Sequence, residues 1–156
     1  MLEIAIGFYC VYFLINVYTV FMQIDYVKKA RLQSPVILTA SKFKIAGDYG
    51  VESQKLSLLG IFYEFVLFFI WISVGLVALD AATNTLFGWQ KAVVFIDLFI
   101  IINWALALPF DLYKIFKLDK KYEFSNMTPS LFIKDTIKSG ILFLVFGLEY
   151  RLAFKL

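Results

Sequence analysis

The sequence predicts an all-α protein, a polytopic membrane helical bundle of about four membrane helices with short interfacial helices in its cytoplasmic loops. Two observations predict this class. Of the 156 residues, 62% are hydrophobic, whereas soluble domains contain about 45–50% apolar residues. In addition, the stretch from Ile4 to Ile24 runs for 21 residues without a charge, and roughly 20 such residues cross a bilayer as a helix. The chain is therefore expected to be an integral membrane protein.

The first membrane span is expected at residues 4–24. A cleaved signal peptide would begin with a basic segment, but Glu3 is the only charged residue before this run. The run contains Cys10, the single cysteine of the chain, which therefore has no partner for an intrachain disulfide. We interpret Cys10 as a small packing residue.

Two further spans are predicted at residues 56–79 and 92–110. Each contains one acidic residue, Glu64 in the first and Asp97 in the second. An acid at mid-helix costs about 3 kcal/mol, while each large apolar residue contributes roughly −0.3 to −0.6 kcal/mol, so the apolar residues outweigh the acid. Pro109 predicts the end of the second of these helices.

A fourth span, expected at residues 138–156, differs from the others. Only ten uncharged residues precede Glu149 and Arg151, which would lie halfway through the helix. Their cost of about 5 kcal/mol exceeds the roughly 3 kcal/mol that the apolar residues supply. This helix is expected to need neighbouring protein or water, and the sequence stops where it would finish.

The basic residues predict the orientation in the membrane. The segments 25–55 and 111–138 carry six Lys or Arg residues each, whereas the connection from Asp80 to Lys91 carries only Lys91. By the positive-inside rule, the two basic loops are cytoplasmic and the N-terminus is outside. The net charge of +3 is then a topology signal, and we expect no nucleic-acid partner. The Lys-, Phe- and Ile-rich composition favours a bacterial inner membrane.

Both basic loops contain signals for helix starts. Ser34-Pro35 and Thr128-Pro129 each place a hydroxyl cap before a proline at the first helical position. Gly47 and Gly50 predict a break within the first loop. These features predict short interfacial helices with lysines that reach the head groups.

Polar residues inside the expected spans are candidates for the lining of a polar chamber, because a charge at membrane depth is costly unless it faces protein or water. Asp97 and Trp104 are seven residues apart and share a helix face, with Asn103 close by. The alternative is a buried ion pair between helices, for example Arg151 with one of the acids. The candidates are Glu64, Asp97, Asn103, Glu149 and Arg151.

The sequence contains no catalytic motif. It has no histidine and hence no H-E-x-x-H zinc motif. Asp97 and Asp111 are fourteen residues apart, roughly 21 Å along a helix, which is too far for two carboxyl groups to share a proton. We therefore expect no catalytic and no metal-binding residue in this chain.

The segment from residue 108 to 138 has a specific pattern of Leu-Pro-Phe, a spaced Tyr and Phe, an acidic-Lys-aromatic loop, and a Thr before a Phe-x-x-Asp-x-x-Lys helix start. Its members are Leu108, Pro109, Phe110, Tyr113, Phe116, Asp119, Lys121, Tyr122, Phe124, Thr128, Phe132, Asp135 and Lys138. This pattern resembles the N-terminal membrane domain of the type I CAAX prenyl proteases, which are integral membrane zinc metallopeptidases. Glu123 and Ser125 depart from it, because the family usually has Gly and Asn there. If that Gly serves a positive-φ turn, Glu123 would strain the turn by roughly 1 kcal/mol.

The resemblance implies a fold of about seven membrane helices around a water-filled chamber. It also implies a catalytic zinc held by an H-E-x-x-H helix and a later Glu, which lie C-terminal to the region seen here. This chain would then supply chamber wall and cytoplasmic loops, bind no zinc itself and be inactive alone. Its expected partners are the lipid bilayer, the C-terminal catalytic half and a peptide or protein substrate. A stand-alone membrane scaffold and a small transporter subunit remain the alternatives.

Overall fold

The computed structural model describes residues 2–33 and 39–153, with side chains up to residue 142. Every regular element in these ranges is helical, and the predicted all-α class is confirmed. The elements are α1 (Leu2–Ala30), α2 (Ala40–Ile70), the π-helical η1 (Trp71–Gly75), α3 (Leu76–Ala82), α4 (Trp89–Tyr113), the π-helical η2 (Lys114–Leu118), α5 (Asp119–Lys121) and α6 (Pro129–Ala153).

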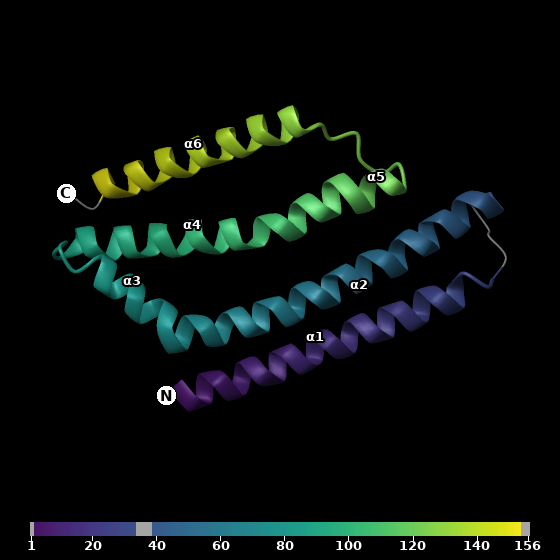
Figure 1. The fold of residues 1–156 in the computed structure, drawn as a ribbon, viewed down its shortest axis with the longest axis horizontal. Helices are drawn as coiled ribbons and strands as arrows, with labels where there is room; N and C mark the ends of the chain where they lie inside the picture. Colours follow the sequence, from purple (N-terminus) through teal and green to yellow (C-terminus); the bar gives the residue numbers. More distant parts are fainter. Residues whose placement is uncertain (1, 34–38, 154–156) are drawn as a thin grey trace.

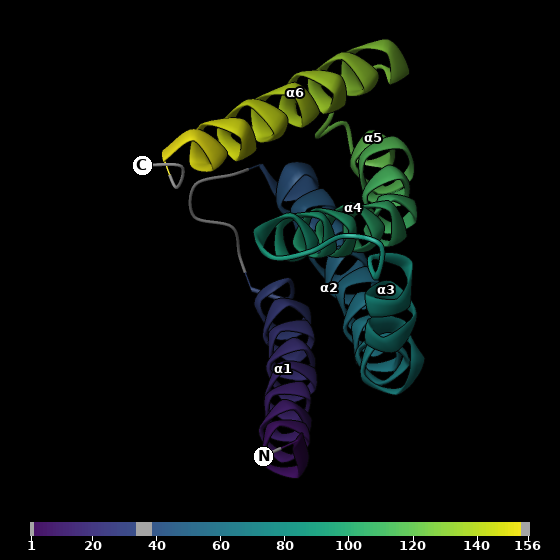
Figure 2. The ribbon, with the colours of Figure 1, turned by 90° about the vertical axis from the view of Figure 1, so that its left-hand side faces the viewer.

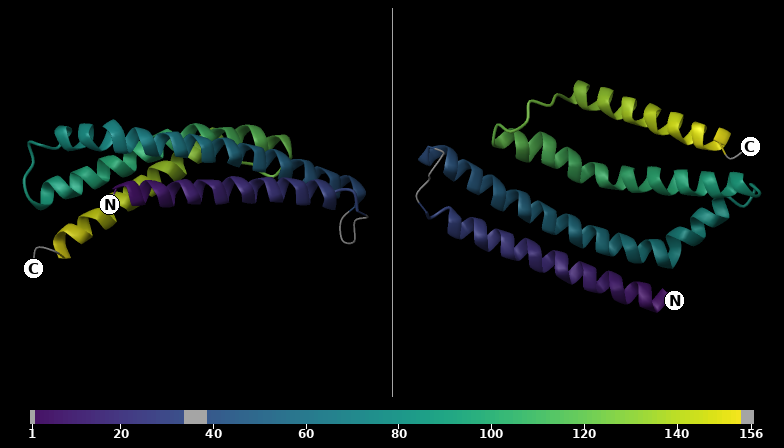
Figure 3. Two further views of the ribbon diagram at one scale, coloured as in Figure 1. Left: turned by 90° about the horizontal axis from the view of Figure 1, so that it is seen from below. Right: turned by 180° about the vertical axis from the view of Figure 1, so that it is seen from behind.

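The rods that contain α1, α2 and α4 alternate in direction and follow one another in this order, with α6 beyond α4 (Figure 1). One end of the bundle contains the end of α1, the start of α2 and the segment from η2 to α5; we call it the basic end, because most lysines of the chain lie there. The N-terminus and the turn between α3 and α4 lie at the opposite end. Helix α6 slants away from the other rods (Figure 2). Seen from below, α1, α2 and α4 form a thin layer (Figure 3).

Three of the described helical rods are long and apolar enough to cross a membrane: Leu2–Ala30, the continuous α2–η1–α3 rod Ala40–Ala82, and Trp89–Lys121. Large apolar side chains on these rods are exposed, including Leu14 and Val77 at more than 60%. Such large exposed apolar surfaces are unfavourable in water. Lipid or neighbouring helices would cover them in a membrane. The chain is a multi-pass integral membrane protein.

Helices α1 and α2 form the closest pair. Their buried core consists of Val20, Ile24 and Val51. Toward the N-terminus of α1 the contact is aromatic, because Phe13 stacks on Phe65 with ring centroids 4.1 Å apart and meets Phe62 edge-on at 5.2 Å. Dispersion and ring contacts of this kind hold helices together where lipid removes the hydrophobic drive.

Gly47 and Gly50 do not break a helix, so that expectation is wrong. Both lie within the continuous α2. A Cβ at Gly47 would lie 3.1 Å from the Arg31 side chain, and one at Gly50 would lie 3.4 Å from Val27. The two glycines therefore let the end of α1 approach α2, where Arg31 also pairs with Asp48.

The first basic loop contains no separate interfacial helix within its described residues. The segment expected to form one is the first part of α2, which starts at Ala40 and continues into the membrane-spanning rod. Packing against the end of α1 stabilises this extension. In the second basic segment the helix predicted from Thr128-Pro129 is not short either, since α6 runs from Pro129 to Ala153. The short helix there is α5, which continues the α4–η2 rod.

Pro109 does not end its helix either, since α4 continues to Tyr113 and the rod goes on to Lys121. Proline is tolerated in such helices because π-helical adjustments and neighbours satisfy the freed carbonyl groups. Here η2 follows five residues after the proline. The predicted helix start at Thr128-Pro129 is confirmed: α6 begins at Pro129, and the Leu131 N–H donates to the Thr128 hydroxyl at 3.3 Å. Ser34-Pro35 lies outside the described residues.

Candidate functional site

A groove with a few polar groups lies between α2 and α4 at the depth of the expected spans. Its volume is about 350 Å³ and its lining is mostly apolar, with polar groups from Tyr9, Glu64, Trp71 and Asn103. The Trp71 indole N–H donates to Asn103 Oδ1 at 3.1 Å, and the Asn103 amide donates to the Phe99 carbonyl at 2.7 Å. The Tyr9 hydroxyl donates to the Glu64 carbonyl at 3.2 Å. Three helices thus meet at hydrogen bonds inside a groove that still has room for water.

The polar lining continues toward the basic end. A second hollow of about 280 Å³ shares Glu64 with the first and adds Ser53, Ser57, Asp111 and Lys114. Ser53, Ser57 and Glu64 follow one another at helical spacing, with Gly60 between them, so they occupy one side of α2. We call this side, together with the facing residues of α4, the polar face.

The structure brings together two of the predicted chamber residues, Glu64 and Asn103, in the same groove. Asp97 is half-buried on α4 and is not among the described residues that line this groove. Glu149 and Arg151 belong to α6, where the structure describes the backbone alone, so their predicted roles lie outside the described side chains.

Sequence reasoning missed Trp71, the residue that links α2 to α4. Trp71 opens the π-helical turn η1, and its ring also packs against Phe99 at 4.7 Å between centroids. A Cβ at Gly75 would lie 2.4 Å from Trp71 Cε3, so Gly75 makes room for the indole. A tryptophan followed by glycine four residues later was the available signal.

A larger groove opens at the basic end and shares Leu56 and Phe110 with the second hollow. Its volume is about 740 Å³, and it lies between α2 and the α4–η2 rod. Four residues of the sequence motif, Pro109, Phe110, Tyr113 and Lys121, line it together with Glu52 of α2. The motif therefore forms part of a groove wall.

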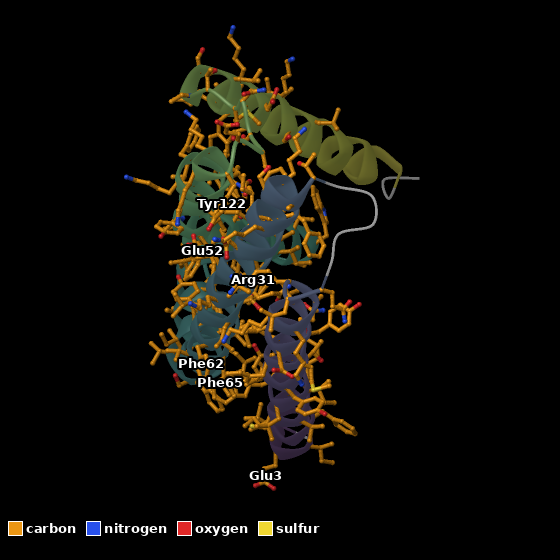
Figure 4. The ribbon with its side chains drawn as sticks, turned by 90° about the vertical axis from the view of Figure 1, so that its right-hand side faces the viewer. Glu3, Arg31, Glu52, Phe62, Phe65 and Tyr122 are labelled. Atoms are coloured by element: carbon orange, nitrogen blue, oxygen red, sulfur yellow. The ribbon has the colours of Figure 1, made fainter. Side chains whose placement is uncertain are left out.

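The second basic segment is fastened to α2 through Tyr49 and Glu52. The Tyr49 hydroxyl donates to Asp119 Oδ1 at 2.9 Å, and its ring packs on Phe124 at 4.6 Å between centroids. Lys121 Nζ lies 2.6 Å from Glu52 Oε1. Figure 4 shows Glu52 and Tyr122 close together. Partial burial raises the pKa of the Tyr122 phenol, and its hydrogen bond with Glu52 raises it further.

Glu123 adopts the positive φ that its place in the motif suggested, with φ 60°. The Phe124 N–H donates to the Asp119 carbonyl at 2.8 Å, and the Glu123 N–H donates to the Lys120 carbonyl at 3.2 Å. This pair of bonds is a Schellman motif, in which the residue after the helix cap takes the left-handed conformation that glycine prefers. Glu123 therefore occupies a glycine position.

The other motif residues also have structural roles. Phe116 of η2 meets Phe132 of α6 edge-on at 5.8 Å, which ties α6 to the preceding rod, and Ser125 accepts a hydrogen bond from the Met127 N–H at 3.1 Å. Asp135 and Lys138 are exposed on α6. The motif thus builds the turn from α4 to α6 and fixes it to α2.

The described residues of this chain do not fit a zinc site. The sequence has no histidine, and its one cysteine, Cys10, lies on α1. Within the described residues, no three His, Cys, Asp or Glu side chains gather closely enough to hold a metal ion. Zinc in proteins is bound by three or four such ligands.

Comparisons with known proteins agree with this architecture. A family model described as the CAAX prenyl protease N-terminal region, with five membrane helices, matches residues 23–154. The crystal structure of S. mikatae Ste24p is similar to this chain, with a TM-score of 0.81 and 22% sequence identity. The match covers 91% of this chain and 36% of the Ste24p chain, so this chain spans about a third of that protein. No curated protein sequence matches this chain.

Proposed function

Because the chain belongs to the CAAX prenyl protease N-terminal family, we propose that it forms chamber wall and cytoplasmic loops of a zinc metalloendopeptidase that cleaves membrane-associated proteins or peptides. The observation that supports the proposal is a set of polar side chains within the expected spans: Ser57 and Glu64 of α2 and Asn103 of α4 line grooves between these helices. Polar groups in such positions are expected to face water or a polar ligand.

In this proposal the zinc is held by the C-terminal catalytic half and supplies the activated water for peptide-bond hydrolysis. The present chain contributes no ligand, in keeping with its composition. Its own part is to keep one wall of the chamber polar and hydrated. Glu64 and Asn103 would offer hydrogen bonds to the backbone of an extended substrate, because an unpaired peptide group at membrane depth is costly.

We further propose that the basic end faces the cytoplasm and that the N-terminus and the turn at residues 83–88 lie on the other side. The support is the asymmetry of the lysines, which gather where α1 ends, α2 starts and the η2–α5 segment lies. The bilayer covers the outward apolar surfaces in this arrangement. A bacterial inner membrane is the membrane that we propose.

The test is to isolate the native protein with an antibody against residues 40–55 from membranes of the source cells. The expected result is a product, either one chain above 18.0 kDa or a complex with a second chain, that contains zinc and cleaves a prenylated CAAX peptide. A zinc chelator should abolish the cleavage. An isolated 18.0 kDa product without zinc and without peptidase activity would contradict the proposal and favour a scaffold or a transporter subunit.

A further inference from the structure

The groove at the basic end has an apolar floor and a charged rim. Its apolar lining comes from Leu56 and Leu59 of α2 and from Phe110 and Tyr113 of α4. Leu118 of η2 also lines it. Leu59 is 62% exposed and Tyr113 is 55% exposed, so both present surface to an occupant, whereas Leu118 is 4% exposed and belongs to the wall. A volume of about 740 Å³ is large enough for an acyl chain with its glycerol backbone.

The groove also lies at the depth where a lipid would meet it. Four of its lining residues, Leu56, Leu59, Pro109 and Phe110, lie at the ends of the spans expected at residues 56–79 and 92–110. Lys55 directly precedes the first of these spans, and Lys121 reaches the groove from the end of α5, eleven residues after Phe110. The floor therefore faces the hydrocarbon, and the rim lies in the head-group layer.

The charges of the rim match a single anion. Lys55 and Lys121 are cationic, and Glu52 of α2 is anionic, with its Oε1 2.6 Å from Lys121 Nζ. The rim therefore carries one net positive charge, and a phosphodiester carries one negative charge. Tyr113 also lines the groove, and a tyrosine has both an apolar ring and a hydroxyl that can donate a hydrogen bond. Basic pockets between membrane helices at this level bind anionic head groups.

We propose that this groove binds one anionic glycerophospholipid of the surrounding bilayer, with an acyl chain on Leu56, Leu59 and Phe110 and the phosphate at Lys55 and Lys121. The lipid would join α2 to the turn between α4 and α6, next to the contact of Tyr49 with Asp119. The proposal requires membrane insertion and does not depend on proteolysis. A neutral phospholipid would fit the floor but would lack the attraction of the rim.

The test is lipid titration of the complete, delipidated protein in mild detergent, followed by native mass spectrometry. Phosphatidylglycerol is expected to bind with at least about fivefold higher affinity than phosphatidylcholine of the same chain length. The reason is that the rim's one net positive charge attracts the anionic head group, as a single basic residue at a membrane surface does. Lys55→Gln should remove this preference and leave phosphatidylcholine binding unchanged. Glu52→Gln should strengthen phosphatidylglycerol binding by about the same factor, because it leaves Lys121 without its carboxylate partner.

Two matched controls separate the groove from general effects. Lys42→Gln removes an exposed lysine from the same helix and the same end, and should not alter either affinity. Leu59→Trp fills the groove and should weaken both lipids. Leu14→Trp, at a residue with 63% exposure, should weaken neither.

Equal binding of the two lipids would overturn the proposal, and so would an equal effect of Lys55→Gln and Lys42→Gln. Inorganic phosphate that displaces phosphatidylglycerol at millimolar concentration, with Leu59→Trp having no effect, would also overturn it and reduce the groove to an anion site. If another segment of the protein covers the groove, neither lipid will bind there, and the proposal fails. Each of these results leaves the protease proposal untouched.

Discussion

At the scale of single residues, Glu123 adopts a backbone conformation that glycine normally occupies, and its surroundings stabilise that conformation. A non-glycine residue with a left-handed backbone costs about 1 kcal/mol. The strain persists because both bonds of the Schellman motif close around Glu123 and because Phe124 is held by Tyr49. The sequence located this position correctly, but the dihedral angle depends on contacts with α2 that are seventy residues away in the chain.

We predict that Glu123→Gly stabilises the protein by about 1 kcal/mol, since glycine adopts this conformation without steric cost. In a chain of this size the thermal midpoint should rise by about 3 °C. Thermal unfolding in detergent, followed by tryptophan fluorescence, measures the change. Glu123→Ala removes the same charge but keeps the strain, so it should give no comparable gain. A gain that is equal for Ala and Gly would mean that charge, and not backbone strain, sets the cost.

At the scale of elements, the two π-helical turns were beyond prediction from the sequence. A π turn adds one residue to a helix and shifts its faces, but an apolar membrane helix shows little periodicity to reveal such a shift. In η1 the turn is stabilised by a distant partner, since Trp71 donates to Asn103 of α4. The role of two glycines was also not predictable from the sequence. Gly47 and Gly50 predicted a helix break, but in the structure they allow α2 to pack closely against α1.

We predict that Gly75→Ala destabilises the protein by about 2 kcal/mol, because the new methyl group would overlap the Trp71 ring. Thermal unfolding of the detergent-solubilised protein measures the loss. Gly60→Ala is the matched control: no atom lies within 4 Å of a Cβ at Gly60, so the change should be neutral or mildly stabilising. In a Trp71→Leu background the Gly75→Ala cost should fall by 1 kcal/mol or more; additive effects would exclude the overlap as the cause.

At the scale of the whole molecule, the sequence predicted the helical class and the membrane insertion. It also named Glu64 and Asn103 as candidate lining residues, and both line one groove in the structure. It did not predict the shape, because the shape depends on which helix faces meet. The described core is small, with Val20, Ile24, Val51, Leu79 and Leu118 as its buried apolar residues. Such a thin core is expected of membrane helices, whose association depends on packing and interhelical hydrogen bonds more than on a large buried apolar core.

The proposed orientation gives a prediction for the intact molecule. In a Cys10→Ser background, Thr85→Cys should react with a membrane-impermeant maleimide on intact cells, because the turn at 83–88 would face outward. Lys44→Cys and Asn126→Cys, both at the basic end, should react only after the cells are opened. Labelling is measured by the mass shift of the protein on a gel. The reverse pattern would place the basic end outside and contradict the positive-inside argument.

The continuous rod from Ala40 to Ala82 has a consequence for imaging. As a straight helix its 43 residues would extend for roughly 65 Å, and the bend at η1 shortens this end-to-end length. A bilayer with its head groups measures about 40–45 Å. One end of the rod therefore projects beyond a detergent belt, and α1 braces it through the Arg31–Asp48 pair. Membrane proteins without such a projection are hard to align in electron micrographs, whereas this helical pair would give each particle image a visible direction.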